Sequence, residues 1–367
     1  MMTFEAFWSR PPDFGRGREQ DPLGLSSLHE AAADVLLPLL SGRTRKAKEY
    51  VWVLVGLRWA GEQAATDNEI WANFEIFEKA LKLYWFHCGH RRGFNGVDAI
   101  KKHYEAGRTD FDFKLISNQR SLGLLGAYLR SLRKAGLVKD RTLSLEENAA
   151  HALIDSITFS WRGTISGYGW LDRTFARAEE GFSRKMYKEL GRRLFDRDDM
   201  RDVAATIKTL GQRPEWRKAA PRLATSNDKQ ILAGVGNDFA YFSRQATKAF
   251  WCVLKSGERS PSDVQPRRLR QLAWREIVFR SATMQGFREP FDKFLSEIGL
   301  HPRRALIQLH CEIWKRRGHL VPWIQLNNGK AQIRPDIALK LPPAEVEWDL
   351  RWAVAYRLIG ETGWRPI

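Results

Sequence analysis

Apolar residues recur at helical spacing along most of this chain of 367 residues. After Thr66 and Glu69, which have the spacing of a capping box, apolar and aromatic side chains follow at helical intervals as far as Trp85. Such a stripe is typical of a helix that buries one face, so a place in the core is favoured over a base-stacking platform. Two further helices are predicted at His29 to Leu40 and Thr44 to Trp59. The pattern predicts a mainly α-helical protein.

Stretches rich in glycine, proline and polar residues interrupt the helical pattern. The first 22 residues have the composition of an extended arm, and the segment 256–266, SGERSPSDVQP, has that of a linker. A chain of this length is also expected to form more than one domain. We therefore predict a multidomain protein with an arm at its start and a basic domain at its end. The predicted segments are 1–96, 97–160, 161–255 and 256–367.

A short β-hairpin is predicted near the C-terminus. Two brief strand-like runs in WIQLNNGKAQIRP flank the residues Asn327 to Lys330. An Asn-Gly step favours a tight hairpin turn because both residues accept a positive φ.

The segment SLGLLGAYLRSLRKAGLV, from Ser121 to Val138, predicts an amphipathic helix that ends at Gly136. One face carries the leucines at positions 122, 125, 129 and 132, which we expect in the core. On the opposite face, small residues would let the backbone approach DNA closely, and flanking cations could meet phosphates or guanine edges. The residues of this polar face are Arg120, Gly123, Ala127, Arg130, Ser131 and Lys134.

Beyond this helix the sequence predicts a small wing. The runs Leu137-Val138 and Thr142 to Ser144 can form two short strands around Lys139, Asp140 and Arg141, and Ser144 with Glu147 has the capping-box spacing that starts another helix.

The order helix, wing, helix over residues 97–157 resembles the winged helix-turn-helix superfamily. In that superfamily a leucine-patterned recognition helix leads directly into the wing, as Ala135-Gly136-Leu137-Val138 does here. The resemblance implies DNA contact, although many winged helices dock proteins instead, so a docking role and a purely structural role stay open. The contacts expected in this region are Arg120, Arg130, Ser131, Lys134 and Arg141.

The segment Asp21 to Leu25, DPLGL, with the following LLPLLSGRTRKAKEYVWVL, is similar to proteins encoded in bacterial phage-defence islands. This resemblance implies a multi-gene setting, with co-encoded protein subunits as partners. It assigns no residue a role.

The charge of the chain favours nucleic acid as the partner. Lys and Arg number 60 against 43 Asp and Glu, a net charge of +17, and such an excess attracts polyanions and releases their counterions on contact. Residues 251–340 alone hold 17 basic and 8 acidic side chains, in a region where we expect a second basic surface. Its expected contacts are Arg267, Arg268, Arg270, Lys315, Arg316 and Arg317.

Several kinds of chemistry lack the spacing they need. His87, Cys88 and His90 have no paired ligands at zinc-site spacing, and Pro335-Asp336 is not followed by the acid and lysine of a restriction-type nuclease. No Walker-type lysine follows the glycines near Gly167. We therefore expect no catalytic residue, no metal and no cofactor, while an enzyme with dispersed catalytic residues remains an alternative.

Three widely separated cysteines do not suggest a disulfide framework, and neither a signal segment nor a membrane span is recognisable. These features predict a cytoplasmic protein. The sequence as a whole predicts a non-catalytic nucleic-acid-binding subunit of a bacterial multi-protein assembly, with duplex DNA favoured over RNA. The alternative is a scaffold whose winged helix docks partner proteins.

Overall fold

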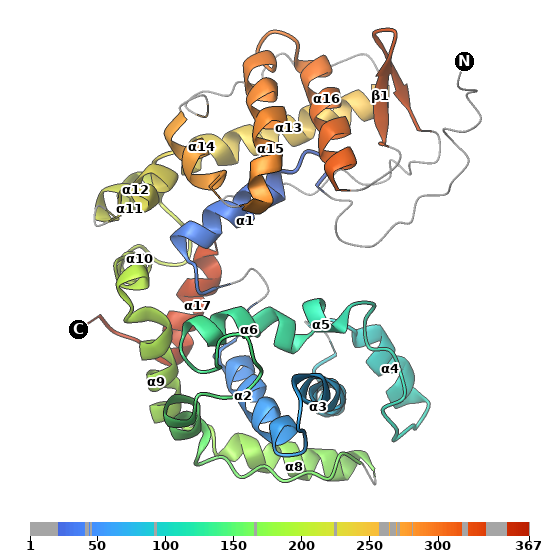
Figure 1. The fold of residues 1–367 in the computed structure, drawn as a ribbon, viewed down its shortest axis with the longest axis vertical. Coiled ribbons are helices and arrows are strands. Elements are labelled where there is room, and N and C mark those ends of the chain that lie inside the picture. The colour runs from blue at the N-terminus through green and yellow to red at the C-terminus, as the bar shows by residue number, and fades with distance from the viewer. Residues whose placement is uncertain are drawn as a thin grey trace. The chain divides into compact units, whose positions relative to one another are not determined.

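The computed structural model is mainly helical, as the sequence predicts: its described residues form seventeen α-helices and one two-stranded sheet (Figure 1). None of the described helices combines the length and apolar character needed to cross a bilayer. Of the predicted N-terminal arm, residues 1–22, only Asp21 and Pro22 are described, and both are buried against the rest of the protein. The residues described are 21–40, 44, 46–91, 94–164, 167–223, 226–256, 264, 269, 272–280, 282–317, 322–334 and 351–366.

The chain divides into two compact units, and each joins segments that are far apart in the sequence. Unit 1 consists of Met1–Leu36 and Arg213–Leu350, and unit 2 of Leu37–Gln212 and Arg351–Ile367. This division differs from the four consecutive segments that the sequence predicts. Glycine and proline mark local breaks in the chain, but they do not report which later helix returns to an earlier one. Of the predicted linker at 256–266, only Ser256 and Val264 are described.

Unit 1 contains most of the C-terminal helices together with the first helix of the chain. The elements are α1 (Leu25–Leu36), α11 (Trp216–Arg222), α12 (Asn227–Gly234), α13 (Gly236–Ser256), α14 (Leu272–Val278), α15 (Ala282–Glu297), α16 (Pro302–Arg316), β1 (Ile324–Asn327) and β2 (Lys330–Ile333). The aromatic core includes Trp274, whose ring centroid lies 6.0 Å from that of Phe239 and 6.2 Å from that of Phe291. The helix pair α15 and α16 packs beside the sheet (Figure 1).

The sheet confirms the predicted hairpin. Strands β1 and β2 are antiparallel, and Asn327 pairs with Lys330 across a turn in which Asn328 has φ 50° and Gly329 has φ 76°. Both turn residues therefore lie in the left-handed region, which Asn and Gly tolerate best.

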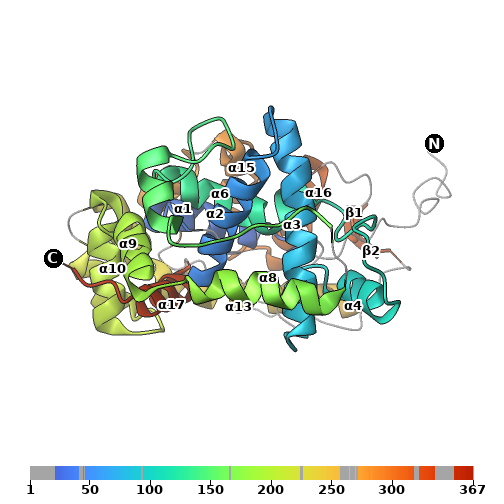
Figure 2. The same ribbon diagram turned by 90° about the horizontal axis from the view of Figure 1, so that it is seen from below.

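Unit 2 holds the remaining helices. These are α2 (Ala47–Gly61), α3 (Asp67–His87), α4 (Val97–Glu105), α5 (Gln119–Leu122), α6 (Leu124–Lys134), a π-helical turn (Glu147–His151), α7 (Ala152–Ile154), α8 (Tyr168–Glu180), α9 (Arg184–Phe195), α10 (Asp198–Leu210) and α17 (Trp352–Thr362). The unit is built around α2 and α3, and α8 crosses α3 (Figure 2). Trp52 lies at its centre, with Phe77, Phe159 and Phe175 within ring-contact distance.

Helix α3 begins with the predicted capping box, in which the Thr66 hydroxyl accepts from the backbone N–H of Glu69 and the Glu69 carboxylate accepts from that of Thr66. Its aromatic stripe forms part of the core, because Phe74 and Phe77 are fully buried. Trp71 and Trp85, near the two ends of the stripe, are exceptions and stay partly exposed.

Helix α17 packs against α9 and α10, which precede it by more than 140 residues. The side chains of Thr362 and Trp364 fill the space beside Gly191 in α9, where an added Cβ would clash with them. The indole of Trp352 donates to the carbonyl of Gly211 at 2.8 Å, and the Glu361 carboxylate accepts from the backbone of Ala47 at 2.6 Å. Unit 2 is therefore completed by the last described helix.

A buried ion pair fixes the start of α6. The Glu78 carboxylate on α3 lies 2.5 Å from the Lys82 ammonium, and both side chains are almost fully buried. The same carboxylate accepts from the backbone N–H of Leu124 at 2.7 Å and from the Gln119 amide at 3.0 Å. An acceptor with negative charge at this point satisfies a free N–H of the helix and interacts favourably with its dipole.

Two glycines make room for this cap. A Cβ at Gly123 would lie 2.4 Å from the carbonyl oxygen of Gln119 and 2.6 Å from the Glu78 carboxylate, and a Cβ at Gly126 would lie 2.3 Å from the carbonyl oxygen of Arg120. The close approach of α5 to α6 thus explains both glycines, of which Gly123 was predicted to lie on the face toward DNA.

Replacing Glu78 by Ala should lower the free energy of unfolding by about 3–5 kcal/mol, because it leaves the Lys82 ammonium buried without its carboxylate. Urea denaturation measures this decrease. The double variant Glu78→Gln with Lys82→Met should be affected less, since no charge is then buried. Glu105→Ala, which breaks an exposed pair with Lys101, is the control and should change stability by less than about 0.5 kcal/mol. Equal decreases for Glu78→Ala and Glu105→Ala would contradict the assigned role of the buried pair.

His103 on α4 is 4% exposed and stacks on Phe113, with their ring centroids 4.1 Å apart. Burial lowers the pKa of His103, and the charges of Arg108 and Lys79 act in the same direction, whereas Asp110 opposes them. The folded state therefore resists a proton that the unfolded state accepts.

The free energy of unfolding should consequently fall as the pH drops below about 6.5, the ordinary pKa of histidine, until the lower folded pKa is passed. His103→Gln should reduce this pH dependence in urea denaturation series at pH values on either side of 6.5. The exposed His151→Gln is the matched control and should retain the dependence of the parent protein. An unchanged dependence in His103→Gln would show that other groups cause it.

Candidate nucleic-acid interface

The predicted recognition helix is interrupted in the structure. Helix α5 ends at Leu122 and α6 starts at Leu124, with Gly123 between them in an extended conformation. The break turns α6 relative to the continuous helix that the leucine spacing predicts. The buried face of α6 consists of Leu124, Leu125, Tyr128, Ser131 and Leu132.

This change of face corrects two expectations. Ser131, predicted as a DNA contact, is 1% exposed and its hydroxyl donates to the carbonyl of Leu39, so it is part of the core. Leu122 and Leu129, predicted as core residues, are only partly buried. Arg120 and Arg130 are exposed, as the sequence predicts.

A short hairpin follows α6. Gly136 has φ 65°, after which Val138 and Leu145 form an antiparallel bridge, flanked by a hydrogen bond from the backbone of Lys139 to the carbonyl of Ser144 at 2.9 Å. Arg141 at the tip is exposed and has φ 64°. The chain then enters the π-helical turn at Glu147. The two short strands predicted for the wing are reduced to this single bridge, and the helical turn begins after Glu146 without the predicted capping box of Ser144 and Glu147. The superfamily assignment stays a prediction.

The exposed side of α6 lines an open groove of about 470 Å³. Its apolar surface comes from Trp71 on α3 and Leu129 on α6, and its cations come from α5 and α6. The lining residues are Trp71, Arg120, Ser121, Gly126, Leu129, Arg130, Arg133, Lys134 and Asp140. We call this hollow the first groove.

A second groove of about 410 Å³ adjoins it and shares Arg133 and Lys134. It lies between the C-terminal ends of α6 and α9. Its lining residues are Arg133, Lys134, Ala135, Gly136, Arg192, Arg193, Asp196 and Arg197. Together the two grooves are lined by seven cationic side chains and two carboxylates.

Three of these cations also hold the surface in place. The Arg133 guanidinium donates to the carbonyl of Thr142 in the hairpin at 2.7 Å, and the Lys134 ammonium donates to the carbonyl of Pro38 at 3.1 Å. Arg197 donates to the carbonyl of Lys134 and so ties the segment between α9 and α10 to the end of α6. The grooves are therefore bounded by fixed elements.

Part of the positive charge is balanced within α9. Glu189 lies 2.6 Å from the guanidinium of Arg192 and 2.9 Å from that of Arg193, and these hydrogen bonds lower the pKa of the Glu189 carboxyl. The basic residues at the ends of α6 and α9 also face the negative ends of two helix dipoles. A structural role therefore accounts for some of this charge. The dipole argument does not extend to Arg120 and Arg130, which lie away from the ends of these two helices.

Sequence reasoning found Arg120, Arg130 and Lys134 but missed Arg133, Arg192, Arg193 and Arg197. The adjacent pair Arg192-Arg193 near the end of a helical pattern was the available signal. Nothing in the sequence indicated that the end of α9 lies beside the end of α6, because this neighbourhood is created by packing between segments about 60 residues apart.

The structure describes only part of the basic surface expected in residues 251–340. Arg267, Arg268 and Arg270 lie outside the described residues. Lys315 and Arg316 are exposed at the end of α16. Arg317, predicted as a nucleic-acid contact, instead binds inside unit 1: its guanidinium lies 2.9 Å from the Asp21 carboxylate and donates to the Asp21 carbonyl at 2.7 Å. This pair fixes the chain ahead of α1 to the end of α16.

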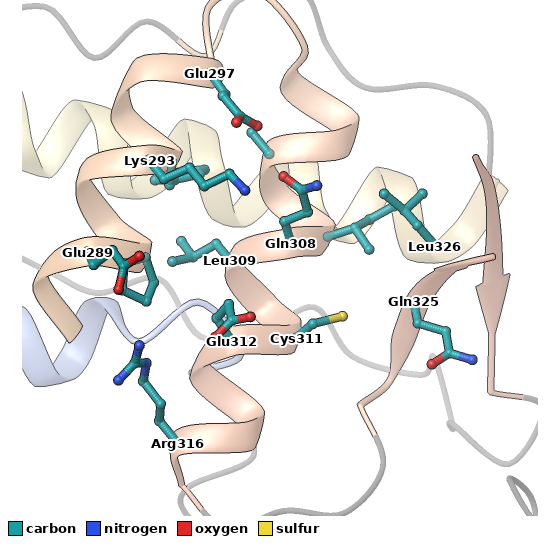
Figure 3. Close-up of a pocket in the computed structure, with 14 residues that line it drawn as sticks. Glu289, Lys293, Glu297, Gln308, Leu309, Cys311, Glu312, Arg316, Gln325 and Leu326 are labelled. Carbon is teal, nitrogen blue, oxygen red and sulfur yellow. The ribbon is translucent and has the colours of Figure 1, made fainter. Parts of the chain in front are cut away.

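A third hollow, of about 490 Å³, lies within unit 1 between α15, α16 and β1. Figure 3 shows charged side chains of both signs around it, with Lys293 and Gln308 extending from the two helices. The Cys311 thiol donates to the carbonyl of Ile324 at 3.3 Å, and burial raises its pKa to about 11. A thiol with this pKa is protonated at neutral pH and is a poor nucleophile.

His87 and Cys88, considered as metal ligands, and His310 in unit 1 have other partners. His87 Nδ1 lies 2.9 Å from the Tyr104 hydroxyl, and the Cys88 thiol donates to Asp172. The two ring nitrogens of His310 contact the carbonyl of Pro22 and the backbone N–H of Trp323. Across the described part of the chain, no three His, Cys, Asp or Glu side chains are grouped so that they could hold a metal.

Comparisons of the chain with protein-family models, with curated proteins and with solved structures gave no match. The two grooves are therefore interpreted from their own geometry and charge.

The new assignment of faces on α6 predicts different effects for two leucines. Leu132→Ala removes methyl groups that are fully buried and should lower the free energy of unfolding by about 2–5 kcal/mol. Leu129→Ala should cost less than about 1.5 kcal/mol, because its side chain is already partly exposed in the first groove. Urea denaturation of both variants provides the measurement. A larger decrease for Leu129→Ala than for Leu132→Ala would instead support the buried face that the leucine spacing predicts.

Proposed function

We propose that this chain is a non-catalytic nucleic-acid-binding protein that contacts the phosphate backbone of duplex DNA through the two grooves beside α6. The observation that carries the proposal is the concentration of seven cations, from three helices and a connecting segment, along one continuous pair of grooves. A polyanion that lies there replaces several counterions at once, which is the main source of backbone affinity.

The positions of the exposed cations support a backbone contact. Arg120 and Arg130 extend from α5 and α6, and Arg141 stands at the tip of the hairpin that follows α6. Because helices and an anchored hairpin carry these side chains, the backbone beneath them needs little ordering on binding. Duplex DNA is proposed over duplex RNA because the B-form major groove admits a helix, whereas the A-form groove is too narrow.

The similarity of the segment beginning at Asp21 to proteins of bacterial phage-defence islands extends the proposal to a wider setting. We place the chain as a subunit of a multi-protein assembly, in which co-encoded proteins are its further partners.

Duplex DNA should bind with an affinity that falls linearly on a logarithmic scale of salt concentration, with a slope of about −0.9 for each phosphate neutralised. Fluorescence anisotropy of a labelled duplex over a series of KCl concentrations measures this slope. An affinity that does not change with salt would contradict backbone binding.

The double reversal Arg120→Glu with Arg130→Glu should weaken duplex binding by about tenfold for each arginine that binds a phosphate. It should also make the slope less steep by about 0.9 for each such arginine. The matched control is Lys101→Glu with Lys102→Glu, which makes the same change in net charge on exposed positions of α4 in the same unit. Thermal denaturation checks that all variants are folded.

Equal weakening in the two double variants would mean that only net charge matters, and the grooves would then have no special part in binding. Normal DNA binding by the folded groove variant, combined with failure to associate with a co-encoded partner, would favour the scaffold function.

A further inference from the structure

Trp71 differs from three buried tryptophans of unit 2. The indole N–H groups of Trp52, Trp59 and Trp161 each donate to a carboxylate or backbone carbonyl inside the protein. Among the described residues, the Trp71 indole N–H has no acceptor and its ring meets no other aromatic ring. Its ring is instead partly exposed in the first groove, where the guanidinium carbon of Arg120 lies 5.8 Å from the ring centroid.

The first groove therefore combines two surfaces with different preferences. The ring of Trp71 and the side chain of Leu129 offer an apolar face, and the cations Arg120 and Arg130 stand beside it. Phosphates alone would occupy the cations and leave the apolar face in water. An intact duplex also leaves it in water, because the faces of paired bases are stacked on one another.

A ligand that suits both surfaces carries a planar, weakly polar ring close to a phosphate, as an unpaired nucleotide does. Indole is a good stacking partner for a base, and a guanidinium can cover the opposite face of the same base. The separation between Arg120 and Trp71 exceeds that of two planes in direct contact, so a modest movement of this exposed arginine would admit a ring between them.

We infer that the first groove binds an unpaired nucleotide, whose base stacks between Trp71 and Arg120 while its phosphate contacts Arg130. The inference rests on the proposed binding of nucleic acid and specifies its ligand: DNA with a single-stranded end, gap or displaced base rather than an uninterrupted duplex.

Three labelled probes test the inference with the full-length chain. The first is a blunt duplex, the second is the same duplex with a short oligothymidine overhang, and the third carries an abasic overhang of equal length. The second and third probes have the same phosphates and differ only in their bases. The wild-type chain should bind the oligothymidine overhang about tenfold more tightly than the abasic overhang, because stacking of one base on an aromatic ring contributes affinity of this size.

Variants assign the difference to the groove. Trp71→Leu should abolish the preference for the oligothymidine overhang over the abasic overhang. Trp71→Phe retains an aromatic ring and should keep part of the preference. Because Trp71 is partly buried, the melting temperature of Trp71→Leu is measured to check that the variant is folded. The comparison of the two overhangs by the wild-type chain needs no variant.

Each outcome has a separate meaning. Equal wild-type binding of the two overhangs would overturn the inference and leave backbone binding intact. A preference that survives in folded Trp71→Leu would also overturn it, since the base would then be bound elsewhere. If the chain binds none of the three probes, the proposed function itself is contradicted, and a protein partner becomes the expected occupant of the groove.

Discussion

The surface beside α6 depends on one buried carboxylate. Glu78 accepts the first backbone N–H of α6, contacts Gln119 in α5 and neutralises Lys82, whose ammonium in turn donates to the carbonyl of Asn95 at 3.0 Å. A charge in this position is costly to bury alone, so the network is stable only when all of its partners are in place. The start of α6, and with it the direction of every side chain on that helix, is set by this requirement.

The other end of α6 is held by its own basic residues. Arg133 and Lys134 reach the hairpin and the segment ahead of α2, and Arg197 binds the last carbonyl of the helix. The same cations thus serve structure and line the grooves. These three cations need little reorganisation when an anion arrives, because hydrogen bonds to backbone carbonyls already hold them beside the grooves.

Local signals in the sequence were sufficient where a single interaction decides the structure. The Thr66–Glu69 capping box and the Asn328–Gly329 turn both follow from short-range chemistry, and both were predicted. The face of α6 was not, because leucine spacing cannot reveal the break at Gly123, which arises from a carboxylate more than 40 residues away. The burial of Ser131, and the approach of the end of α9 to the end of α6, likewise depend on packing between distant segments.

The return of α17 to unit 2 has a consequence for synthesis on the ribosome. Residues 37–212 of unit 2 emerge before most of unit 1. The side chains that fill the space beside Gly191, and the acceptor for the backbone of Ala47, belong to residues that follow all of unit 1. During translation, the apolar faces of α9 and α10 that α17 later covers therefore stay exposed while the rest of unit 1 is synthesised.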